Sequence, residues 1–237
     1  MEILKATFKE RKTEIFKLLS TMKFLEQKEQ ERYDGITAFK VFFDSDEELL
    51  GYQELINILK SNVSLMIYNI IEFTVSNLLE AIYTEIKTYE LSYVDVNDDL
   101  KGIWRKARIK AINSAGINHD SFIKINESMI QEIVENKTLE ISYRNVLRGG
   151  NLDGEGIREL FYQHGIKTTC KNYRPDILKN VKNKRNELAH GSVSFVDALR
   201  DKVISDIEES SKIIVKYLEE LIDVIQNFIN NGTYRAK

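Results

Sequence analysis

Apolar residues recur at helical intervals over most of the chain, so the pattern predicts a protein built mainly of helices. In residues 3–31 they stand three and four positions apart, as on one face of an α-helix. Residues 33–43 carry a glycine turn and several aromatic side chains, which predicts a turn and an irregular segment. A second helix is expected from a cap at Ser45 to about Tyr89. Its middle is apolar around most of its circumference, which is typical of the central helix of a bundle.

Residues 91–150 have the weakest pattern in the chain. A helix is expected from Leu100 to Ala115, ended by Gly116. Residues 137–143 alternate weakly between apolar and polar side chains, which leaves room for a short strand pair. We therefore expect an irregular middle insertion here.

The last third of the chain again shows helix starts and stops. Three helices are predicted: one from a cap at Asn151 to Gln163, before Gly165; one from Pro175 to Ala189, before Gly191; and one from a Ser194–Asp197 capping box to about Asn231. Pro175 is the single proline of 237 residues, which favours long helices. The prediction is an all-α helical bundle in one domain, residues 1–237.

Composition narrows the class of protein. Hydrophobic residues make up 43% and charged residues 30%, which is typical of a soluble globular chain. The single cysteine, Cys170, excludes an intramolecular disulfide and fits a reducing compartment. No apolar run approaches the roughly 18 residues that cross a bilayer, and the N-terminus lacks a signal-peptide pattern. We therefore expect a cytoplasmic protein without a membrane partner.

The candidate chemistry lies on the helix that contains residues 182–191, KNKRNELAHG. With about 100° per residue, three apolar side chains define the buried stripe of this helix: Ile177, Val181 and Leu188. Asn186 and His190 are four residues apart and therefore neighbours on the outer face. Arg185 lies at the border between the two faces.

These three side chains have the properties needed to cleave RNA without a metal. A lone histidine is more often packed or merely solvated than catalytic. Here, however, an imidazole, an amide and a permanent cation share one short surface. The histidine could take the proton from a ribose 2′-hydroxyl, and the guanidinium could stabilise the charge that builds on the phosphate. One histidine cannot serve as base and acid at once, so we predict a homodimer that brings two copies together.

Arg185-Asn186-Glu187-Leu188-Ala189-His190 matches the R-x4-H signature of the HEPN superfamily. The order of the predicted helices and caps over residues 151–231 resembles the MAE-type branch of this superfamily. This resemblance implies an all-α dimer. It also implies a metal-independent endoribonuclease of a toxin–antitoxin, abortive-infection or restriction-linked system, with an antitoxin or similar protein as partner. Some members of the superfamily are non-catalytic. The apolar second helix is similar to the family's earlier core helix, in which an acidic residue, here Glu72, often faces the site.

Other polar residues are weaker candidates. Lys182, Asn183 and Glu72 form a second tier of site residues, although Glu72 could equally be the partner of a buried cation. Five residues could hold RNA through phosphates or base stacking, or could simply form solvated helix faces: Trp104, Arg105, Arg108, Arg144 and Arg148. The histidines and the cysteine show no metal-ligand spacing, so neither a metal nor a cofactor is expected.

Three functions remain open from the sequence. The first is the endoribonuclease acting on RNA. The second is a non-catalytic module of the same fold that docks a partner protein. The third is a nucleotide-binding domain in which Arg185 and Lys182 hold phosphate.

Overall fold

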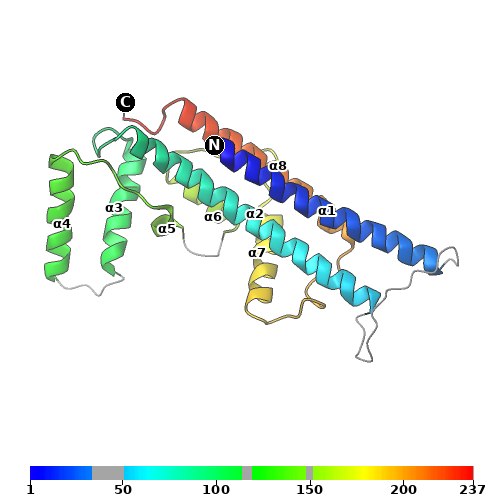
Figure 1. The fold of residues 1–237 in the computed structure, drawn as a ribbon. Coiled ribbons are helices and arrows are strands. Elements are labelled where there is room, and N and C mark those ends of the chain that lie inside the picture. The colour runs from blue at the N-terminus through cyan, green and yellow to red at the C-terminus, as the bar shows by residue number, and fades with distance from the viewer. Residues whose placement is uncertain (34–50, 114–118, 148–151, 237) are drawn as a thin grey trace. The chain divides into compact units, whose positions relative to one another are not determined.

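The computed structural model describes residues 1–33, 51–113, 119–147 and 152–236, and within these it contains helices and no strand (Figure 1). The helices are α1 (Glu2–Tyr33), α2 (Tyr52–Thr88), α3 (Asp98–Asn113), α4 (His119–Val134), α5 (Tyr143–Val146), α6 (Gly154–Tyr162), α7 (Pro175–Ala189) and α8 (Ile204–Asn230). The all-α prediction is therefore confirmed.

The chain divides into two compact units. One contains residues 72–171 and 218–237 together with Met1, and the other contains residues 2–71 and 172–217. Below, these are called the first and the second unit. Helices α2 and α8 each contribute residues to both. The single-domain organisation stays a prediction.

The core of the second unit joins α1, the first half of α2, α7 and the first half of α8. The apolar face predicted for α1 is buried, and it includes Leu4, Phe8, Ile15, Leu19 and Met22. Lys23 of α1 forms an ion pair with Glu208 of α8, with 2.5 Å between Nζ and Oε2. This contact agrees with the course of α1 alongside the first half of α8 in Figure 1.

Helix α2 is the most completely buried element. Eight of its aliphatic side chains have no exposed surface: Val63, Ile70, Ile71, Val75, Leu78, Leu79, Ile82 and Ile86. Among the described helices, α2 alone is long and apolar enough to cross a membrane, and 50% of its most apolar window is buried inside the protein. The prediction that no apolar segment is long enough to cross a membrane is therefore wrong for α2. The central helix of a bundle meets the same criterion.

The middle segment is helical, and the strand predicted at residues 137–143 is wrong. Only an isolated bridge forms there, between Ser92 and Thr138, and Tyr143 already begins α5. The sequence analysis also missed α4, whose partner in the hairpin is α3. The predicted end of α3 at Gly116 and the predicted cap Ser45 lie outside the described residues.

Two predicted helix starts are corrected by the structure. Helix α6 is capped by Asp153, whose side chain accepts a hydrogen bond from the Gly156 amide, and not by Asn151. Ser194 and Asp197 do form the predicted reciprocal contact, in which the Asp197 amide donates to Ser194 Oγ at 3.1 Å. That contact closes a turn rather than a helix, because α8 begins only at Ile204.

Candidate functional site

Local sequence sets both ends of α7. Pro175 occupies its first turn, where the missing amide hydrogen costs nothing. At the other end, Gly191 has a φ of +67° and donates to the Leu188 carbonyl, and the Ser192 amide donates to the Glu187 carbonyl. This pair of bonds is a Schellman motif, which needs a left-handed residue just after the cap. His190 is therefore the C-cap of α7.

Arg185 is held against the core by an aromatic ring. Its guanidinium carbon lies 4.8 Å from the centroid of Tyr68 of α2, and Tyr68 has no exposed surface. Arg185 Nη1 also donates to the side-chain oxygen of Asn186 at 3.0 Å. A cation over a tyrosine face is worth roughly 0.5–2 kcal/mol. The half-buried guanidinium thus sits at the border of the helix, as the helical positions predicted.

Asn186 links the other two predicted residues. Its side chain accepts from Arg185, and its backbone carbonyl accepts the amide of His190 at 3.0 Å. The His190 side chain is exposed, and within the described part of the chain no hydrogen bond or ion pair engages the imidazole. The structure therefore joins Arg185 to Asn186 directly and leaves the imidazole at the solvent-facing end of the same helix.

The second-tier residues Lys182, Asn183 and Glu72 lie on two different helices, α7 and α2. Lys182 is half-buried and Asn183 is exposed, both on α7. Glu72 is half-buried and belongs to the first unit, whereas α7 belongs to the second. One contact on α7 was missed by the sequence analysis: Lys184 Nζ lies 2.7 Å from a carboxylate oxygen of Glu187. This pair neutralises a cation and an anion on the helix.

The basic run on α3 is less available to RNA than predicted. Trp104 is 1% exposed and packs against Tyr93, so it has no open face for a base, and the stacking prediction is corrected. Arg108 lies over the Trp104 ring and is paired with Glu132 at 2.6 Å. Arg105 is exposed and bonded to the Tyr93 hydroxyl at 3.2 Å.

The remaining basic candidates follow α4. Arg144 is exposed and lies over the ring of Tyr143, at 5.9 Å. Arg148 lies outside the described residues. Among these five candidates, Arg105 and Arg144 therefore have the exposure that a phosphate contact requires.

A second histidine, His164, is buried and has a structural role. It has no exposed surface, and its ring nitrogens lie 2.7 Å from the Leu160 carbonyl oxygen and 2.6 Å from the Tyr83 hydroxyl. A carbonyl can only accept, so Nδ1 carries the proton and Nε2 accepts from Tyr83. Burial lowers the pKa of His164 to about 4. A neutral, inaccessible imidazole is no candidate for the general base.

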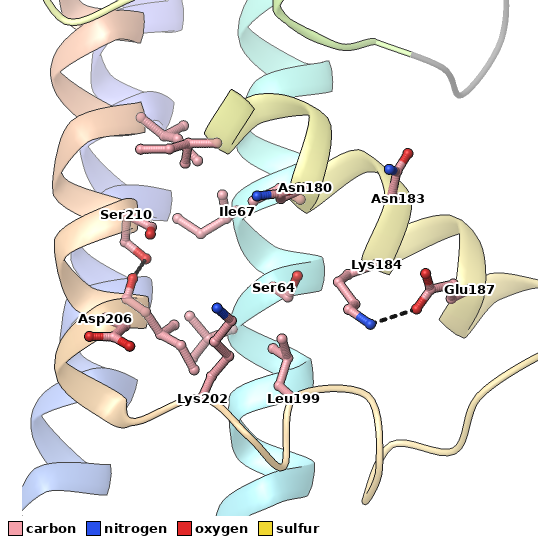
Figure 2. Close-up of a pocket in the computed structure, with 16 residues that line it drawn as sticks. Ser64, Ile67, Asn180, Asn183, Lys184, Glu187, Leu199, Lys202, Asp206 and Ser210 are labelled. Carbon is pink, nitrogen blue, oxygen red and sulfur yellow. Dashed lines mark hydrogen bonds and ion pairs between the residues drawn. The ribbon is translucent and has the colours of Figure 1, made fainter. Parts of the chain in front are cut away.

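The second unit also contains a cavity of about 380 Å³. It lies among α2, α7, α8 and the segment before α8 (Figure 2). Arg185, Asn186 and His190 are not among its lining residues. Within the described ranges, no three His, Cys, Asp or Glu side chains are grouped as metal ligands.

Comparison with known protein families gave one match. A family model for the MAE-type HEPN family matches residues 2–234, which is nearly the whole chain. Comparisons with the curated proteins and with the solved structures gave no match.

Proposed function

Since this chain belongs to the MAE-type HEPN family, we propose that it is a metal-independent endoribonuclease whose site is formed by Arg185, Asn186 and His190. Domains of this family are often nucleases or toxins. The proposal is supported most by the different environments of two side chains on α7. The guanidinium is held in place by Tyr68 and Asn186, whereas the imidazole is exposed at the helix end.

In the proposed reaction, His190 removes the proton from a ribose 2′-hydroxyl. The 2′-oxygen then attacks the adjacent phosphorus, and the bond from phosphorus to the 5′-oxygen breaks. The products are a 2′,3′-cyclic phosphate and a 5′-hydroxyl, which takes up a proton from the acid. Arg185 stabilises the charge on the phosphate oxygens as the transition state forms.

The reaction needs an acid as well as a base, and a homodimer would supply both. A two-fold contact brings the same surface of each copy together, so two imidazoles would share one groove. We therefore propose that the active form is a homodimer. The same proposal includes three further points. An antitoxin-like protein restrains the nuclease, the nuclease acts in phage defence, and it is located in the cytoplasm.

The test compares the wild-type protein with His190→Ala and Arg185→Ala on a defined single-stranded RNA. We expect His190→Ala to keep the wild-type free energy of unfolding within about 1 kcal/mol, because the His190 side chain is exposed. Arg185→Ala should cost roughly 0.5–2 kcal/mol, the value of its contact with the Tyr68 ring. Both should lose RNA cleavage by at least about a hundredfold, the usual contribution of a positioned acid or base. DNA of the same sequence should remain intact, since it lacks the 2′-hydroxyl, and a chelator should leave the rate unchanged.

Cleavage that persists in His190→Ala would show that another group is the base. Lys179→Ala is a matched control, because Lys179 is an exposed residue of the same helix that is not among the candidate site residues. Growth of cells that express the wild type or His190→Ala, followed together with total RNA integrity, tests the toxin role.

A protein-docking role without catalysis is the second candidate, and α4 favours it. This helix exposes four large apolar side chains: Phe122, Ile123, Ile130 and Val134. Exposed apolar patches of this kind are typical of interaction surfaces. If the docking role were the whole function, purified wild-type protein would leave every RNA intact.

A further inference from the structure

The cavity in the second unit has no part in the proposed RNA site, yet it has the character of a ligand site. Its walls come from three helices and the segment before α8, all within one compact unit. Seven aliphatic residues line it: Val63, Ile67, Ile177, Val181, Leu199, Ile207 and Ile214. No aromatic side chain is among the lining residues. Such walls suit an aliphatic chain better than a flat base, which prefers to stack on rings.

Two polar side chains of the lining, those of Ser64 and Lys202, are placed to meet the head group of a ligand. Ser64 is 7% exposed, and its hydroxyl makes no hydrogen bond within the described part of the chain. The hydroxyl oxygen is not sealed from solvent, so it can donate a hydrogen bond to a polar atom bound in the cavity. The ammonium of Lys202 forms no ion pair with any described residue. In Figure 2 the Lys202 side chain is directed into the space between α2 and α8, whereas the Asp206 carboxylate points away from it.

The other cation of the lining, Lys184, is already neutralised. Its Nζ lies 2.7 Å from the Glu187 carboxylate, so it offers no free charge to a ligand. Lys202 is therefore the cation of the lining that can pair with a ligand, and because the Asp206 carboxylate is directed away from it, an anionic head group is favoured beside Lys202. The cavity volume of about 380 Å³ lies within the range of roughly 300–1,000 Å³ that is usual for small-molecule sites.

We propose that this cavity binds a medium-chain aliphatic carboxylate. The chain would lie against the aliphatic wall formed by α2, α7 and α8. The carboxylate would pair with Lys202 and accept a hydrogen bond from the Ser64 hydroxyl. Decanoate is a medium-chain aliphatic carboxylate, so it is the probe for the test.

Isothermal titration calorimetry on the full-length protein tests the proposal without reference to RNA cleavage. The ligands are hexanoate, octanoate, decanoate, decanol and decylammonium, each kept below its micelle concentration. Affinity should rise about fourfold for each buried methylene from hexanoate to decanoate. Decanoate should bind more tightly than decanol, and decylammonium more weakly than either.

Variants then test each contact. Lys202→Gln should weaken decanoate binding about two- to fivefold, the range of a partly exposed ion pair, and leave decanol unaffected. Lys216→Gln is the matched control, because Lys216 is an exposed lysine of α8 that does not line the cavity. Ser64→Leu places extra atoms in the cavity and should weaken decanoate at least tenfold.

Three results would overturn the proposal. The first is the absence of saturable decanoate binding. The second is an affinity that does not change with chain length. The third is equal binding of decanoate and decanol together with no effect of Lys202→Gln. The chain-length series uses the unmodified protein, so it decides the matter even if Ser64→Leu does not fold.

Discussion

The buried pair of Tyr83 and His164 makes the stability of the protein depend on pH in a way that one substitution should remove. Burial lowers the pKa of His164 to about 4, whereas an unfolded histidine has a pKa near 6.5. Between these values the unfolded chain binds a proton that the folded chain does not, so stability falls as the pH falls. For these two pKa values, the linkage relation gives a loss of about 2 kcal/mol between pH 7 and pH 5.

The perturbation is His164→Gln. An amide keeps an acceptor for the Tyr83 hydroxyl, which burial keeps protonated by raising its pKa, but it carries no proton in this pH range. The loss of the bond to the Leu160 carbonyl should cost about 1–3 kcal/mol at pH 7, the usual cost of a buried unpaired group. The further loss between pH 7 and pH 5 should be smaller than in the wild type by about 2 kcal/mol.

Urea unfolding followed by circular dichroism at pH 7 and pH 5 measures both quantities. Tyr83→Phe is the second arm. It removes the hydroxyl but leaves the imidazole buried, and burial is the cause of the lowered pKa of His164, so the pH dependence should persist. Tyr162→Phe is the matched control, because the Tyr162 side chain is 63% exposed and its hydroxyl makes no hydrogen bond with described residues. If wild type and His164→Gln lost equal stability over this range, the assignment of a buried neutral imidazole would be refuted.

Three further predictions concern stability and the proposed site. Gly191→Ala should destabilise the protein by about 1–2 kcal/mol, because residue 191 has a φ of +67°, a conformation that strains an alanine even where its Cβ would meet no other atom. The control Gly102→Ala, inside α3, should be neutral or stabilising in the same urea assay. Tyr68→Leu should lower kcat for RNA more than it raises KM, because it frees the Arg185 guanidinium, whereas Tyr68→Phe keeps the ring and should retain most of the rate. Equal loss in both variants would contradict the cation–π role. Asp153→Ala should cost about 1 kcal/mol by removing the α6 cap, and an unchanged urea midpoint would count against that contact.

The helical class, the bounds of α7 and the border position of Arg185 could all be predicted from the residues alone. Each of these depends on short-range chemistry. A proline at the first turn, a glycine just after the cap and the helical repeat act within a few residues, so they can be recognised without a fold. The exposed position of His190 followed from the same repeat.

Tertiary structure decided what the side chains meet. The sequence contains no sign that Trp104 is buried, that Tyr68 lies under Arg185 or that Tyr83 bonds His164, since these partners lie far from each other along the chain or are selected by packing. The start of α8 was misjudged for a related reason. The Ser194–Asp197 contact caps a turn as well as it caps a helix, and only the packing of the following apolar residues shows where the helix begins. Local chemistry thus sets where elements start and stop, whereas burial and charge pairing depend on neighbours that only the folded chain brings together.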